Sequence, residues 1–183
     1  LSQKLGCTVL LCSATLPTFD QIMHPMFINN ELIVKKDYSA DFRRTNIIYD
    51  KHVRSLEWIA HRAEELIVEK DSVLVVCNTK SEAKKIYDLI SSNCQKGFIT
   101  ASMCVKHREE SLDRIKTAIH NHEKVICVST QCIEAGVDIS FETGIRLMAG
   151  LDNIIQTAGR INRFGEYFSG DRSRQQYLET ILR

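Results

Sequence analysis

Three short apolar runs constrain the fold of this chain more than any other feature. Residues 8–12, 73–77 and 125–129 are rich in Val, Leu and Ile, and polar residues do not alternate with apolar ones within them. Strands that are buried on both faces have this pattern, and they occur in parallel sheets with helices on both sides. The runs therefore predict three inner strands of a covered sheet.

Helical patterns separate these runs along the chain. At Thr79-Lys-Ser-Glu82 the residue spacing predicts a capping box, in which the hydroxyl and the carboxylate satisfy free backbone N–H groups at a helix start. The alternation predicts an α/β fold, with right-handed crossovers and a mainly parallel sheet flanked by helices. The predicted helices cover residues 54–69, 79–90, 107–120 and 154–163, and further strands are expected at 97–102 and 144–148.

Polar residues follow the predicted strands. Hydroxyl and amide side chains make up most of residues 13–15, 78–79, 100–102 and 129–131, where the exceptions are Ala14 and Ala101. Ligands of open parallel sheets bind beyond the carboxyl ends of the strands, where helix N-termini also favour phosphates. We call these residues, which follow the carboxyl ends of the strands, the crest of the sheet. The crest is predicted to form a phosphate-binding surface.

Two arginines mark the last predicted helix. With Gln156 at 0° on a helical wheel, Arg160 falls at about 40° and Arg163 at about 340°, opposite an apolar seam. Like charges on one helix face repel by about a few tenths of a kcal/mol. A bound polyanion would explain the pair, because a guanidinium is a planar fork that suits phosphate oxygens. The alternative is an ordinary solvated face.

The segment before this helix contains two further candidates. Gly136 would let the backbone approach a ligand closely, and Asp138 is flanked by Val137 and Ile139, so we expect its carboxylate to have a partner. Asp138 could instead cap a turn.

Composition excludes several classes of protein. The 24 Lys and Arg residues balance 23 Asp and Glu, so the net charge of +1 gives no general attraction to nucleic acid. No apolar run approaches 18 residues, so no membrane span is expected. The seven Cys residues include no C-x-x-C pair, and no metal site is predicted. Reduced thiols fit a cytoplasmic protein.

The sequence has neither a G-x-x-x-x-G-K-[ST] loop for a triphosphate nor an acidic quartet for Mg²⁺. Arginines that face a phosphate without such a loop resemble a finger supplied to a site elsewhere. We therefore expect half of an active site, and no ATPase activity from this chain alone.

These residues, in this order, resemble the second RecA-like domain of a superfamily 2 helicase. Residues 13–15 resemble motif III, 75–79 motif IV, 129–138 motif V and 156–163 motif VI. The resemblance implies a RecA-like three-layer sandwich. It also implies the end of a first motor domain at 1–17, a connector at 18–46 and the second motor domain at 47–166. The tail at 167–183 has no assigned placement, and its residues predict a short helical stretch at 175–182.

The chain is most similar to the CRISPR-associated helicase–nucleases of type I interference. This similarity rests on residues 129–141, on Ala149-Gly-Leu-Asp152 and on residues 156–163, called the arginine motif below. This resemblance implies an ATP-driven 3′-to-5′ translocase on single-stranded DNA. A guide-RNA surveillance complex would recruit it to degrade foreign DNA. ATP and Mg²⁺ would bind mainly to a first motor domain, and a histidine–aspartate nuclease domain would belong to the same protein.

The family's functional residues carry over by position. Arg160 and Arg163 would reach the γ-phosphate with Gln156 beside them, and Gly136 and Asp138 would border the nucleotide. The DNA backbone would contact Asn78, Thr79, Ser102, Arg108 and Thr130. Two other readings remain open: a DNA-repair or RNA helicase of the same superfamily, and a non-catalytic α/β module that docks an acidic protein.

Overall fold

The structure is a computed structural model that describes residues 44–134, 136–167 and 176–183. These residues belong to the second of two compact units, Ser39–Arg183. The predictions for the strand at 8–12, for residues 13–15, for the segment 1–17 and for all but residues 44–46 of the connector at 18–46 lie outside the described residues.

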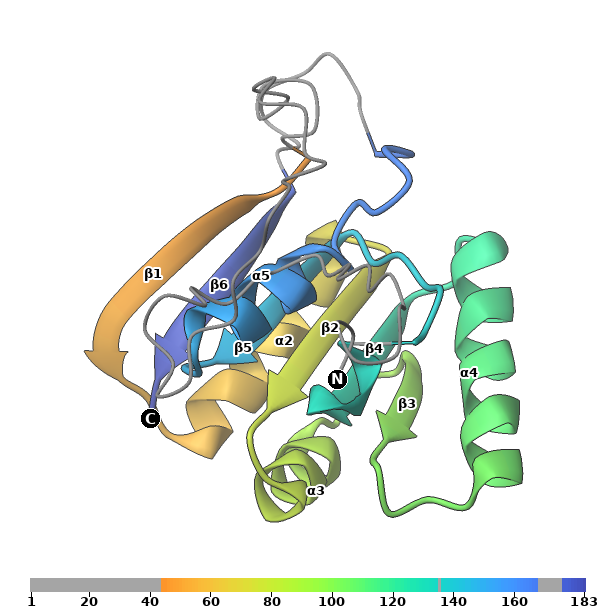
Figure 1. The fold of residues 1–183 in the computed structure, drawn as a ribbon, viewed down its shortest axis with the longest axis horizontal. Coiled ribbons are helices and arrows are strands. Elements are labelled where there is room, and N and C mark those ends of the chain that lie inside the picture. The colour runs from red at the N-terminus through yellow and green to blue at the C-terminus, as the bar shows by residue number, and fades with distance from the viewer. Residues whose placement is uncertain (1–43, 135, 168–175) are drawn as a thin grey trace, which may run out of the picture. The chain divides into compact units, whose positions relative to one another are not determined.

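A six-stranded parallel sheet forms the centre of this unit, with the strand order β1-β6-β5-β2-β4-β3 (Figure 1). The predicted α/β class and parallel sheet are confirmed. The strands are β1 (Asn46–Val53), β2 (Ser72–Cys77), β3 (Gln95–Ile99), β4 (Val125–Thr130), β5 (Thr143–Leu147) and β6 (Tyr177–Leu182). The helices are α2 (Leu56–Glu69), α3 (Lys80–Leu89), α4 (Val105–His120) and α5 (Leu151–Ala158), with a short 3₁₀ turn, η2 (Gln131–Ile133).

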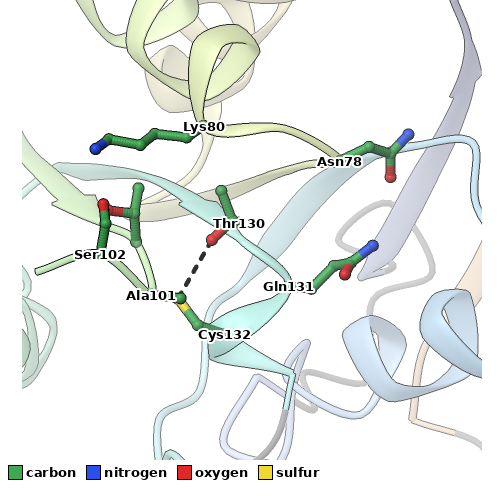
Figure 2. Close-up of a pocket in the computed structure, with 8 residues that line it drawn as sticks. Asn78, Lys80, Ala101, Ser102, Thr130, Gln131 and Cys132 are labelled. Carbon is green, nitrogen blue, oxygen red and sulfur yellow. Dashed lines mark hydrogen bonds between the residues drawn. The ribbon is translucent and has the colours of Figure 1, made fainter.

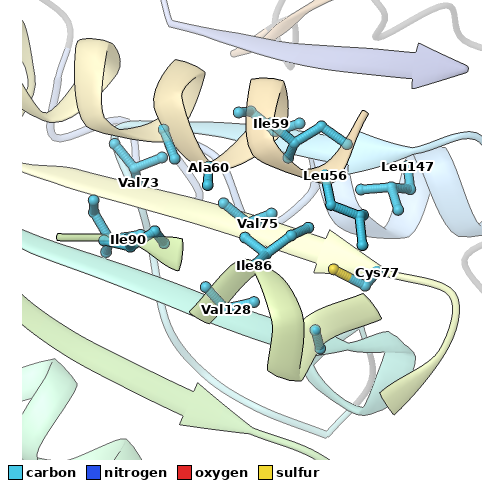
Figure 3. Packing of buried hydrophobic residues seen from close by; sticks show 14 of the residues in the cluster. Leu56, Ile59, Ala60, Val73, Val75, Cys77, Ile86, Ile90, Val128 and Leu147 are labelled. Carbon is cyan, nitrogen blue, oxygen red and sulfur yellow. The ribbon is translucent and has the colours of Figure 1, made fainter. Parts of the chain in front are cut away.

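Side chains of the central strands alternate between two apolar cores, one on each face of the sheet. On β2, Val73, Val75 and Cys77 pack with α2 and α3, as Figure 3 shows. Leu74 and Val76 point to the other face and pack with residues of α4 and α5. All six residues of β2 are buried, which explains why its sequence is apolar without alternation. The result is a three-layer sandwich.

Local signals fix both ends of α3. The capping box is present: the Thr79 hydroxyl accepts from the Glu82 N–H at 3.2 Å, and the Glu82 carboxylate accepts from the Thr79 N–H at 3.0 Å. At the other end, Lys96 Nζ donates to the Ile90 carbonyl at 2.9 Å and so satisfies a free group of the last turn.

The prediction of a helical stretch over residues 175–182 is wrong. Tyr177–Leu182 is strand β6, which lies between β1 and β5 and pairs in parallel with both. Leu178, Thr180 and Ile181 are buried there. Arg62 of α2 also donates to the Glu179 carboxylate at 2.6 Å. A six-residue segment carries little intrinsic preference, so pairing with two neighbouring strands decides its conformation.

The sequence also predicted no strand at residues 46–53, which form β1. Its side chains are mostly exposed, and among the described strands only β6 pairs with it. Ile47, Ile48 and Val53 lie exposed on it. The continuous burial that identified the inner strands is therefore absent here.

We predict that Gly144→Ala destabilises the sheet. A Cβ at this position of β5 would lie 2.8 Å from the Leu74 carbonyl oxygen of β2 and 3.0 Å from Ile161 Cδ1. Because backbone cannot yield as a side chain does, we expect a loss of about 1–3 kcal/mol in the free energy of unfolding, measured by urea denaturation. Gly150→Ala is the control, since its nearest contact is at 3.9 Å. Equal losses in the two variants would contradict the prediction.

Candidate functional site

A pocket of about 540 Å³ lies at the carboxyl ends of β2, β4 and β3, three strands that are adjacent in the sheet (Figure 2). Its position agrees with the predicted crest, because the residues after these three strands meet there. The lining residues are Asn78, Lys80, Thr100, Ala101, Ser102, Thr130, Gln131 and Cys132.

Three of the five predicted nucleic-acid residues line this pocket: Asn78, Ser102 and Thr130. Thr79 does not line it, and its hydroxyl caps α3. Arg108 lies on α4 and is also outside the lining.

Lys80 lines the pocket but was not among the predicted site residues. Lys80 is the first residue of α3, directly after the cap, so the capping box at Thr79 was the signal that could have placed it at the crest. It adds an ammonium group to a wall made otherwise of hydroxyls, amides, a methyl group and a thiol.

Hydrogen bonds within the crest hold the hydroxyls in place. Thr100 Oγ1 and Ser102 Oγ are 3.2 Å apart, and the Thr130 hydroxyl donates to Cys132 Sγ at 3.5 Å (Figure 2). Below them, the Ser129 hydroxyl donates to the Ile99 carbonyl at 2.9 Å and ties β4 to β3. Hydroxyls beside an ammonium group suit the oxygens of a phosphodiester.

The arginine motif does not continue the last helix, and this prediction is wrong. Helix α5 ends at Ala158, with Gly159 as its C-cap. Ile161 then forms a parallel bridge with Phe141, and Asn162 has a φ of 50°, outside the helical region. Glycine is a poor helix former, and Ile161 is buried in the core that contains Phe141, so the chain leaves the helical direction after Gly159. The two guanidinium groups therefore do not share a helix face.

Arg160 is turned into the domain. Its side chain is only 7% exposed, and it donates from Nε to the Ile133 carbonyl at 3.1 Å and from Nη2 to the Glu134 carbonyl at 2.7 Å. Burial lowers the pKa of this guanidinium, and the nearby charge of Arg163 lowers it further. Among the described residues, Arg160 Nη1 finds no hydrogen-bond partner.

Arg163, by contrast, faces outward and meets Asp138. Its Nε donates to Asp138 Oδ1 at 2.9 Å, and the two side chains are 38% and 70% exposed. The expectation that Asp138 has a partner is therefore confirmed. Gly136 lies two residues before it with a φ of 70°, a conformation that favours glycine. Gln156 is half-buried near the end of α5.

A buried ion pair that was not predicted from the sequence is hydrogen-bonded to the pocket residue Asn78. Arg146 of β5 is fully buried, and its Nε donates to Glu134 Oε1 at 2.9 Å. Thr157 and Asn153 of α5 also donate to this carboxylate, at 2.9 and 3.1 Å. Burial lowers the pKa of Arg146, while the charge of Glu134 opposes that shift. A charged residue inside the apolar strand at 144–148 was the available signal, since such a charge needs a partner.

The Arg146 guanidinium also orients the pocket. Its Nη1 donates to Asn78 Oδ1 at 2.8 Å and to the Leu147 carbonyl at 2.7 Å. The Asn78 amide nitrogen donates in turn to the Met148 carbonyl at 2.8 Å. Both ends of the Asn78 amide are therefore used inside the protein.

Two cysteines behave as small apolar residues of the cores. Burial raises the pKa of Cys77 to about 12 and raises that of Cys127 as well. In the described part of the chain, no group of three or more His, Cys, Asp or Glu side chains could hold a metal ion. A search of the same residues finds no helix long and apolar enough to cross a membrane.

We predict that Arg146→Met lowers the free energy of unfolding by about 3–5 kcal/mol, because it leaves the Glu134 charge buried and unpaired. The double variant Arg146→Met/Glu134→Leu removes both charges and should recover a large part of this loss. Urea denaturation of both variants measures the difference. A double variant less stable than the single one would show that the pair is not the dominant interaction.

Comparisons with known proteins agree with this geometry. The family model described as "CRISPR-associated nuclease/helicase Cas3, C-terminal" matches residues 69–166. The Cas3 nuclease/helicase of Methanothermobacter thermautotrophicus is 30% identical over 102 residues, and that of Haloferax volcanii is 52% identical over 42 residues. The matches cover 55% and 23% of this chain, but only 12% and 4% of those relatives.

Solved structures share the fold. T. fusca Cas3 in its ATP complex superimposes with a TM-score of 0.63 at 17% identity, over 77% of this chain and 18% of that one. The C-terminal domain of the DEAD-box protein Dbp5 gives a TM-score of 0.57 at 14% identity, over 76% and 78% of the two chains. The RecA-like architecture is thus confirmed. Since the family model covers more than half of its length, the chain belongs to the Cas3 C-terminal family of CRISPR-associated nuclease/helicases.

Proposed function

We propose that this chain is the second motor domain of an ATP-dependent 3′-to-5′ single-stranded DNA translocase that acts in type I CRISPR interference. The observation that carries the proposal is the meeting of three strand ends in one pocket with Lys80, Ser102 and Thr130 in its wall. Membership of the Cas3 C-terminal family supports the same function.

In this proposal the DNA backbone occupies the pocket. Lys80 neutralises a phosphate, the Ser102 hydroxyl donates to a phosphate oxygen, and the Thr130 hydroxyl exchanges its long bond to Cys132 Sγ for a second one. Asn78 shapes the wall through its contacts with β5. Contacts of this kind position a strand without reading its bases. They also explain how a chain with a net charge of +1 can bind DNA through local contacts.

The nucleotide lies on the side of Gly136, Asp138 and Arg163. An exposed ion pair contributes only about 0–1 kcal/mol, so Arg163 can leave Asp138 for a phosphate at little cost. Arg160 Nη1 is buried and has no hydrogen-bond partner among the described residues, so it becomes a second donor to the phosphate when the Arg160 side chain shifts outward. Bound ATP supplies the phosphoryl group whose transfer drives the motor. The arginines stabilise charge on that group, and Gln156 helps to orient it.

In this proposal Mg²⁺ and most contacts to ATP come from a first motor domain, as the family resemblance implies. In the complete protein, a histidine–aspartate nuclease domain cuts the translocated strand, and a guide-RNA surveillance complex recruits the enzyme in the cytoplasm. Recruitment by that complex separates this function from that of a DNA-repair or RNA helicase with the same motor fold.

We predict that Arg163→Ala in the complete protein lowers ATP turnover by about 10³-fold or more, because a finger arginine stabilises charge in the transition state. Binding of single-stranded DNA should stay near the wild-type affinity. Steady-state ATPase assays and fluorescence anisotropy measure the two quantities. Arg114→Ala on the exposed side of α4 is the matched control. Near-normal turnover in the Arg163 variant would rule out its assignment as a finger.

We further predict that Lys80→Gln weakens binding of single-stranded DNA equally for different base sequences. Loss of one phosphate contact should reduce the slope of log K against log salt concentration by about 0.7. Lys84→Gln is the control, since Lys84 lies on the same helix but pairs with Asp88 outside the pocket. An unchanged salt slope in the Lys80 variant would argue against DNA in the pocket.

A further inference from the structure

One short turn is shared by the pocket and by Arg160. Gln131 and Cys132, at the start of η2, line the pocket. Only one and two residues later, the carbonyls of Ile133 and Glu134 accept the hydrogen bonds of the Arg160 guanidinium. A displacement of this turn therefore moves a wall of the pocket and the support of Arg160 together.

The Glu134 carboxylate fixes the end of that turn. It accepts from Arg146 of β5 and from Thr157 and Asn153 of α5, so two elements outside the turn determine its position. Glu134 is itself buried, and a buried carboxylate is held firmly where its partners satisfy it.

Arg146 extends the connection to a second part of the pocket wall. Its Nη1 donates to Asn78 Oδ1 at 2.8 Å, and Asn78 lines the pocket together with Gln131 (Figure 2). Direct hydrogen bonds thus run from a pocket side chain, through Arg146 and Glu134, to the residue whose carbonyl holds Arg160.

We infer that Glu134 and Arg146 are positioning residues that couple occupancy of the pocket to the placement of Arg160. This inference rests on the proposed function, in which the pocket holds single-stranded DNA and Arg160 lies beside ATP. A strand that presses on Asn78 and on the η2 turn shifts one hydrogen-bonded unit, and Arg160 moves with it. DNA binding then raises ATP turnover without a direct contact between DNA and nucleotide.

The test is the double variant Glu134→Gln/Arg146→Met in the complete protein. Removing both charges avoids leaving either one buried alone. We expect the stimulation of ATP turnover by single-stranded DNA to fall by about tenfold, within the range of about 5–150-fold typical of coupling between sites. Turnover is measured at saturating single-stranded DNA and saturating ATP, so that the loss lies in the stimulated kcat whatever happens to either affinity.

The matched control removes a different ion pair, with Arg62→Met/Glu179→Gln between α2 and β6. It should keep full stimulation by DNA even where its melting temperature falls as far. Thr157→Val is a milder second variant, which removes one hydrogen bond to Glu134 and keeps both charges. It should reduce stimulation in the same direction, and it decides the question if the double variant does not fold.

The possible outcomes distinguish a failure of the coupling role from a failure of the proposed function. Full stimulation in folded Glu134→Gln/Arg146→Met or in Thr157→Val would overturn the coupling role. An equal loss in the Arg62/Glu179 control would also overturn it, by assigning the effect to stability alone. A wild-type protein whose ATP turnover ignores single-stranded DNA would instead overturn the proposed function.

Discussion

The arrangement of the pocket and of Arg160 depends on the buried ion pair of Glu134 and Arg146. Taking two charges out of water costs several kcal/mol each, and attraction offsets that cost only where the geometry is good and further hydrogen bonds are made. Here α5 donates to the carboxylate, while the guanidinium donates to groups on β2 and β5. The same contacts bring the ends of these elements to one place, so the charge pair and the crest of polar residues form together.

Much of the fold could be predicted because its signals are local. The runs at 73–77 and 125–129 are apolar without alternation, which only inner parallel strands require. The capping box at Thr79 uses residues three apart, so the start of α3 could be predicted without knowledge of tertiary structure. The pocket followed from topology, since parallel strands bring their carboxyl ends to one edge.

The remaining features depend on contacts between distant parts of the chain. Glu134 and Arg146 are twelve residues apart on different elements, and no spacing rule pairs them. The helical wheel that joined Arg160 to Arg163 assumed that α5 continues past Gly159, but the bridge of Ile161 to Phe141 ends it. The residues of β6 do not themselves predict a strand, because pairing with its two neighbouring strands determines their conformation.

The position of β6 in the sheet also determines when β1 can pair during folding. Strand β1 is the first described strand along the chain, yet its partner is β6, the last one. Pairing of such distant segments requires closure of a long loop, which makes folding slower. Residues 177–182 must therefore be synthesised before β1 can pair with β6. Until then, β5 presents an open edge at which another chain could pair.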